Sequence, residues 1–223
     1  DESPCLWRHT AHEHGRHRHR RLPACPGLAL RYRTGDDAIA IRGAPSRLKD
    51  KTRTCEDIVV EDIVAKVSAS GCRIGVGDGV IRNVDIGNCV VRHAGGGVSV
   101  VAAWNPKQMK AVEIGDVKVH GCLFRDCPRA VEIVSALAKG SVGGVKGLTF
   151  SDCSFDCMIN SCFRGSNENP PTDIRFLDCD FRVLSELRYP GKNRMNLGKM
   201  SKAKTRPVVF ENDRAKDVVF RNC

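Results

Sequence analysis

The chain has 223 residues and a formal net charge of +10, and only 5% of its residues are aromatic. This length allows a full hydrophobic core, and the shortage of aromatic residues beside 21 glycines favours short strands joined by tight turns over packed helices. No apolar run approaches the roughly 18 residues of a membrane span, and no signal peptide is recognisable, so we expect no membrane partner and no retained targeting segment.

Two segments carry the basic excess of the chain. Residues 1–34 hold seven Arg against three acids, and residues 188–206 hold seven Lys or Arg against none. The rest of the chain has 22 bases and 23 acids, so it is close to neutral. Because few aromatic residues lie among the bases, we expect solvated basic segments and no nucleic-acid partner.

Residues 1–30 are expected to form an irregular tail rich in His and Arg. They show no alternation of apolar and polar residues, and their closely spaced histidines offer no fixed surroundings for a metal, so we predict no metal site and no cofactor. Because the chain begins with Asp1 and not with Met, we expect it to be processed, trimmed or a fragment, and we expect a secreted or periplasmic protein. The histidines are His9, His12, His14, His17 and His19.

The segment from Thr34 to Ile41 concentrates the groups that could perform chemistry. Two adjacent carboxylates, Asp36 and Asp37, precede the alternating run Ala38-Ile39-Ala40-Ile41. Neighbouring carboxyl groups can divide the acid and base work that glycoside hydrolysis requires. Gly-Asp-Asp is also ordinary turn chemistry, and the residues alone leave both interpretations open.

One pattern recurs along the chain: apolar-x-apolar-x-(Asn/Asp/Gly)-Cys. Successive copies start 26, 33, 31, 26 and 44 residues apart, as expected for one coil plus loops of varying length. Alternation with period two predicts a strand with one buried face, and the Asn, Asp or Gly suits a turn that requires a positive φ. The first copy has Ile63 in place of Cys. The copies start at Ile58, Val84, Val117, Leu148, Ile174 and Val218.

A second strand follows in most coils, and stacked coils place like residues over like. We therefore predict an all-β fold, a single-stranded right-handed parallel β-helix over residues 31–223. The repeated cysteines should form a buried column of free thiols, because their spacing suits neither a disulfide framework nor zinc. The second strands are Ala38–Ile41, Cys72–Ile74, Val98–Val100 and Val131–Ile133, and the cysteines are Cys89, Cys122, Cys153, Cys179 and Cys223.

Residues 185–206 interrupt the coil spacing and predict a basic loop insertion. The chain then stops at Cys223, inside a repeat unit. A last coil without a cap exposes strand edges and core, so we expect a longer native protein or association at this end.

The segment from Gly35 to Ile41 resembles the GDDxIAI signature of the polygalacturonases and related glycoside hydrolases of the pectin-lyase-like β-helix superfamily. The spacing of the coils is also similar over roughly residues 31–184. The resemblance implies an inverting hydrolase that acts on a polysaccharide or oligosaccharide. In it, Asp36 would protonate the leaving oxygen and Asp37 would help to activate water.

Three motifs of that family differ in this chain. Residues 1–30 lack the Asn-Thr-Asp motif that supplies a third aspartate, and Ser70 stands where the family has the histidine of Gly-His-Gly. The substrate-binding Arg-Ile-Lys of the family is replaced by residues 99–101, Ser-Val-Val. A neutral or differently decorated glycan is therefore as good a candidate substrate as polygalacturonate.

Four other residues are candidates for substrate binding. Strand alternation turns Arg73 and Glu132 outward, where they and His93 can replace the missing groups, and Trp104 can stack on a sugar ring. Two hypotheses follow. The first is a glycoside hydrolase with paired aspartates, and the second is a carbohydrate-binding or adhesion β-helix without catalysis, or an inactive fragment of a hydrolase.

Overall fold

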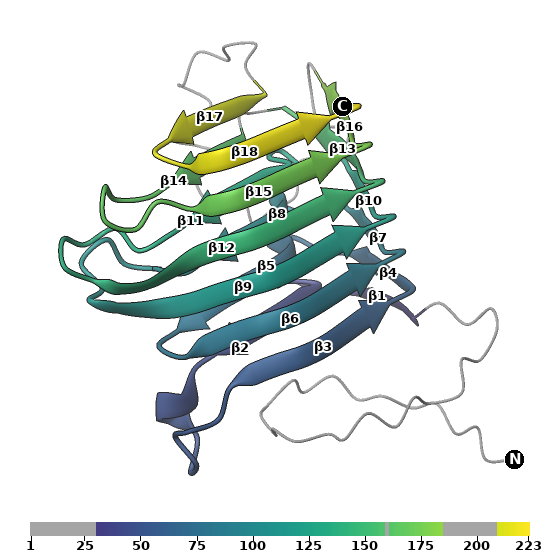
Figure 1. The fold of residues 1–223 in the computed structure, drawn as a ribbon. Helices are drawn as coiled ribbons and strands as arrows, with labels where there is room; N and C mark the ends of the chain where they lie inside the picture. Colours follow the sequence, from purple (N-terminus) through teal and green to yellow (C-terminus); the bar gives the residue numbers. More distant parts are fainter. Residues whose placement is uncertain (1–29, 159–160, 185–208) are drawn as a thin grey trace, which may run out of the picture.

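The computed structural model describes residues 30–158, 161–184 and 209–223. Its strands form three parallel sheets of six strands, called A, B and C here, and each coil of the chain contributes one strand to each sheet in that order. The chain is a right-handed parallel β-helix (Figure 1), which confirms the predicted fold class. The tail predicted at 1–30, apart from Leu30, and the loop predicted at 185–206 lie outside the described residues.

The strands of each sheet follow one another in chain order. Sheet A contains β1 (Leu30–Arg33), β4 (Ile63–Lys66), β7 (Val90–Arg92), β10 (Leu123–Arg125), β13 (Ser154–Cys157) and β16 (Asp180–Val183). Sheet B contains β2 (Ile39–Gly43), β5 (Ser70–Gly77), β8 (Gly96–Val101), β11 (Val131–Val134), β14 (Ser161–Arg164) and β17 (Phe210–Asp213). Sheet C contains β3 (Cys55–Glu61), β6 (Val80–Gly87), β9 (Lys110–His120), β12 (Val142–Ser151), β15 (Thr172–Leu177) and β18 (Lys216–Arg221).

The described part of the chain adds one short 3₁₀ turn, η1 (Pro45–Arg47), between β2 and β3. None of its helical segments has the length and apolar character that a membrane crossing requires.

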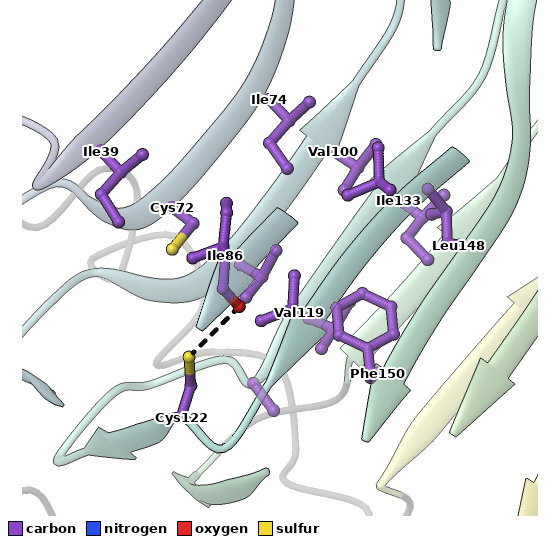
Figure 2. Close-up of a cluster of buried hydrophobic side chains, with 14 of the residues drawn as sticks. Ile39, Cys72, Ile74, Ile86, Val100, Val119, Cys122, Ile133, Leu148 and Phe150 are labelled. Atoms are coloured by element: carbon purple, nitrogen blue, oxygen red, sulfur yellow. Dashed lines mark hydrogen bonds between the residues drawn. The ribbon is translucent and has the colours of Figure 1, made fainter. Parts of the chain in front are cut away.

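The predicted repeat units lie in sheet C, one above the other and in register. Val84 pairs with Ile58 on one side and with Val117 on the other, and Leu148 continues the column. Val84, Val117 and Leu148 are buried inside the coil, and Figure 2 shows Leu148 beside Ile133 of sheet B. Each coil therefore buries its apolar residues against those of its neighbours, which no single coil could do alone.

The repeated cysteines also point inward, as predicted. Cys89, Cys122, Cys153 and Cys179 are buried, whereas Cys223 at the end of the stack is exposed. The Cys122 thiol donates a hydrogen bond to the carbonyl oxygen of Ile86 in the preceding coil (Figure 2). All ten cysteines in the described residues are free thiols. The column therefore acts as packing, with each weak S–H donor satisfied by backbone oxygen.

The turn before each cysteine adopts the predicted left-handed backbone. Asp, Asn or Gly occupies this position in every coil, and these residue types tolerate a positive φ better than others do. The positive φ angles belong to Asp62, Asn88, Gly121, Asp152, Asp178 and Asn222.

A second column with a positive φ crosses sheet C one residue before each repeat unit, and the sequence pattern alone did not indicate it. It places one left-handed residue inside every strand of this sheet. The same residue types recur there: Asp57, Asn83, Asp116, Gly147, Asp173 and Asp217.

The prediction of two strands per coil was incomplete, because sheet A supplies a third. Its strands contain three or four residues and point few side chains inward, so alternation cannot be recognised within them. The missed signal is the apolar residue two positions after the repeated cysteine. In the later coils this residue is Phe, and the rings of Phe124 and Phe155 stack with centroids 5.0 Å apart.

The last coil, β16 to β18, forms one end of all three sheets. In this coil Val219 is 47% exposed and Phe220 is 45% exposed, although the Phe220 ring stacks on Phe176. Association at this end stays a prediction.

Candidate functional site

The turn between β1 and β2 carries the paired aspartates to the edge of sheet B. The backbone N–H of Asp36 donates to the Thr34 hydroxyl at 3.1 Å, and that of Asp37 donates to the Asp36 carboxylate at 2.9 Å. Gly-Asp-Asp therefore does form the turn that its composition suggests. The Asp36 side chain lies in solvent, whereas Asp37 points back over sheet B.

The Asp37 carboxylate is held by three N–H donors. Arg73 binds it with two parallel hydrogen bonds, 2.5 Å from Nε and 3.0 Å from Nη2, and the backbone N–H of Ser70 adds a third at 2.8 Å. The side chains of Arg73 and Asp37 are only 7% and 5% exposed. This is a forked, desolvated ion pair, the geometry in which Arg orients a carboxylate most strictly.

Arg73 faces outward from the coil, as the alternation predicted, but it is not open to solvent. Its guanidinium lies 5.0 Å from the centre of the Trp104 ring, at cation–π distance. Its Nη2 also donates to the Ser70 hydroxyl, which lies 3.4 Å from that of Ser99. We call Asp37, Ser70, Arg73, Ser99 and Trp104 the Arg73 cluster.

Trp104 reaches the cluster because the loop between β8 and β9 folds back over β5. Gln108 holds this loop by donating from its side-chain amide to the carbonyl oxygen of Gly77 at 2.8 Å, and its own amide oxygen accepts the backbone N–H of Trp104. One face of the indole covers Arg73, while the residue as a whole remains 56% exposed. An aromatic surface is thus presented directly above a buried charge pair.

Glu132 lies on the same outward row of sheet B as Arg73, two strands further along. Arg73 pairs with Ser99, and Ser99 pairs with Glu132. The Glu132 carboxylate accepts from Arg129 at 2.8 Å and from Arg164 at 3.3 Å. Glu132 therefore belongs to an ion-pair group with Arg129 and Arg164, and these hydrogen bonds involve no residue of the Arg73 cluster.

His93 lies apart from this row, in the turn between β7 and β8. Its Nδ1 is 2.9 Å from the buried carboxylate of Asp126, and its backbone has a positive φ of 62°. The structure therefore brings Asp37, Arg73 and Trp104 together, adds Glu132 at a distance on the same row, and leaves His93 at the corner between sheets A and B.

Ser70 and Ser99 were not predicted to belong to the site. Both were noted only as departures from polygalacturonase motifs. The signal that could have found them is their position, because each is a polar residue at the height where that family places a catalytic or substrate-binding group.

No group of three or more His, Cys, Asp or Glu side chains in the described residues is arranged to hold a metal ion. Searches against protein-family models, curated proteins and solved structures found no match to this chain. The resemblance to polygalacturonases therefore rests on the segment from Gly35 to Ile41 and on the parallel β-helix.

Proposed function

We propose that this protein is a carbohydrate-active β-helix that binds a polysaccharide along the outward face of sheet B without cleaving it. The observation that carries the proposal is Trp104, whose ring lies over the Arg73 guanidinium at 5.0 Å while the residue stays 56% exposed. An exposed aromatic ring whose inner face is held by a guanidinium can stack on the apolar C–H face of a sugar with its outer face. The segment Gly35–Ile41 resembles a signature of the polygalacturonases, and this resemblance supports a glycan as the ligand.

The burial and the hydrogen bonds of Asp37 favour binding over hydrolysis. An inverting glycosidase needs two working carboxyl groups roughly 6.5–9.5 Å apart, one of which accepts a proton from water. The oxygens of Asp37 already accept from Arg73 and Ser70, and the side chain is 5% exposed. Asp37 therefore acts best as the anchor that fixes Arg73, which in turn supports Trp104.

Glycoside hydrolysis is the second candidate function, and the exposure of Asp36 favours it. Asp36 is the aspartate that the resemblance makes the general acid, and it stands in solvent beside the edge of sheet B. A substrate that lies over Trp104 and releases Asp37 from Arg73 would restore the pair of carboxyl groups. A secreted or periplasmic location belongs to either proposal.

The test is a panel of neutral and acidic polysaccharides, with binding and reducing-sugar release measured on the same samples. We expect binding without sugar release, and we expect Trp104→Ala to weaken binding at least about tenfold, which corresponds to about 1.4 kcal/mol. Met109→Ala is the matched control, because Met109 is the last residue of the same loop and is 55% exposed.

Each result decides between the candidates. Sugar release that Asp36→Asn abolishes would replace the binding proposal with the hydrolase. Failure of every glycan to bind, or equal losses in Trp104→Ala and Met109→Ala, would reject sheet B as a carbohydrate face.

A further inference from the structure

A second polar group lies on the outward face of sheet B, two strands from the Arg73 cluster. The carboxylate of Glu132 on β11 accepts hydrogen bonds from Arg129 at 2.8 Å and from Arg164 on β14 at 3.3 Å. The Cys162 thiol donates to the same carboxylate oxygen, Oε1, at 3.7 Å. We call Arg129, Glu132 and Arg164 the Glu132 group.

The Glu132 group keeps hydrogen-bonding atoms available at the surface. The Glu132 side chain is 27% exposed, its contacts all go to Oε1, and Oε2 accepts from no group in the described part of the chain. Arg164 is 47% exposed, and among the described residues it donates from Nη2 alone, to Glu132 and to the Cys162 sulfur. An acceptor oxygen and guanidinium N–H donors therefore stand together, and a sugar hydroxyl can both accept and donate.

A polar strip joins the Glu132 group to the Arg73 cluster. Arg73 pairs with Ser99, and Ser99 pairs with Glu132, in register. Neighbouring parallel strands are about 4.8 Å apart, so Arg73 and Glu132 lie about 10 Å apart along the stack, which a short oligosaccharide can span. A Cβ atom at Gly96 would come no closer than 3.7 Å to any neighbour, here the Ser99 hydroxyl, so the surface beside Ser99 is open.

The charges in the middle of this face are balanced. The charged residues of β5, β8, β11 and β14 are Arg73, Glu132 and Arg164, and each contacts an opposite charge. The next strand, β17, adds the acids Glu211 and Asp213 to the same face. An acidic chain along this face would bring its carboxylates close to these acids, and like charges brought together oppose binding. A neutral chain meets no such repulsion.

We propose that the Glu132 group is a second sugar subsite and that the glycan bound along sheet B is neutral. One sugar stacks on Trp104, and the hydroxyl groups of a later sugar accept from Arg164 and donate to Glu132 Oε2. The inference rests on the function proposed above, and it gives that site a ligand class and a second point of contact.

The experiment measures, by titration calorimetry, binding of the full chain to cellohexaose, xylohexaose, mannohexaose and hexagalacturonate. We expect at least one neutral hexasaccharide to bind at least about tenfold more tightly than hexagalacturonate. Arg164→Gln and Glu132→Gln should each weaken binding of that neutral hexasaccharide at least about fivefold, through the loss of hydrogen bonds to charged groups.

Arg175→Gln is the matched control for Arg164→Gln. Arg175 pairs with Asp173 on sheet C at 2.9 Å and is 56% exposed, so its replacement should change the affinity less than about twofold. Because Arg164 is itself 47% exposed, Arg164→Gln tests the subsite even if Glu132→Gln fails to fold.

Two outcomes would overturn the inference alone. These are tighter binding of hexagalacturonate than of every neutral hexasaccharide, and losses in Arg164→Gln and Glu132→Gln no larger than in Arg175→Gln. If Trp104→Ala still weakens binding in either case, the function proposed for sheet B stands without the neutral ligand or the second subsite. If none of the four hexasaccharides binds, the proposed function fails, and this inference fails with it.

Discussion

Inside the coils, Phe150 lies on Phe176 and Phe176 on Phe220, and the same contact repeats from coil to coil. On the outward face of sheet B, Arg73 binds Asp37 beneath Trp104, and no neighbouring coil repeats this arrangement in the described residues. The interior is thus periodic, whereas the Arg73 cluster occurs once. Contacts that recur from coil to coil stabilise the stack as a whole. An arrangement that occurs only once is a better candidate for a functional site.

The largest expected effect tests the periodic interior. Phe150 is fully buried, so Phe150→Ala should lower the free energy of unfolding by about 3–5 kcal/mol through lost burial and the cavity it leaves. Urea unfolding of the wild type and the variant measures this difference.

Phe220→Ala is the matched control, because Phe220 occupies the same column but is 45% exposed. We expect Phe220→Ala to lower the free energy of unfolding by less than half as much as Phe150→Ala does. Equal losses would mean that the last coil is as well packed as the middle of the stack.

The next effect tests the Arg73 cluster. Arg73→Met should lower the free energy of unfolding by about 3 kcal/mol, because it leaves the buried Asp37 carboxylate without its partner. The double variant Asp37→Asn/Arg73→Met should recover part of this loss in the same unfolding measurement.

Arg164→Met serves as the exposed comparison, since its pair with Glu132 lies at the surface and should be worth about 1 kcal/mol or less. If Arg73→Met costs no more than Arg164→Met, the cluster is not the rigid support for Trp104 that the proposed function requires.

The smallest effect is a dependence of stability on alkaline pH. Burial raises the pKa of the Cys127 thiol to about 12 from its usual 9.0, and burial raises that of the Tyr32 phenol to about 12 from 10.0. Above pH 9 the unfolded chain loses protons that the folded chain keeps, so stability is complete below pH 9 and falls as the pH rises toward 12.

The slope for a fully buried thiol is about 1.4 kcal/mol per pH unit. Urea unfolding at several pH values between 8 and 11 should show a flatter profile for Cys127→Ala than for the wild type. Identical profiles would mean that Cys127 ionises equally easily in the folded chain.

Much of the fold could be predicted because each coil repeats the same local requirements. Val84, Val117 and Leu148 share a position whose neighbours above and below are also apolar, and Asn88 marks the turn that follows. Sheet A was missed because a three-residue strand such as Val90–Arg92 has one inward side chain and therefore no detectable period.

The candidate site could be predicted only in part. The resemblance indicated Asp36 and Asp37, and alternation indicated that Arg73 faces outward. Nothing in the order of residues indicated that Arg73 would bind Asp37, 36 positions earlier, because that distance is set by the length of one complete coil.

By itself, the sequence determined the parallel stack, its inward cysteines and its left-handed turns, since these follow from residue types repeated at one position per coil. The tertiary structure alone decided which charges meet. Stacking converts separations of about 30 residues into adjacent strands, so the Arg73 guanidinium meets the Asp37 carboxylate from the preceding coil. This pair supports Trp104 on the proposed carbohydrate face.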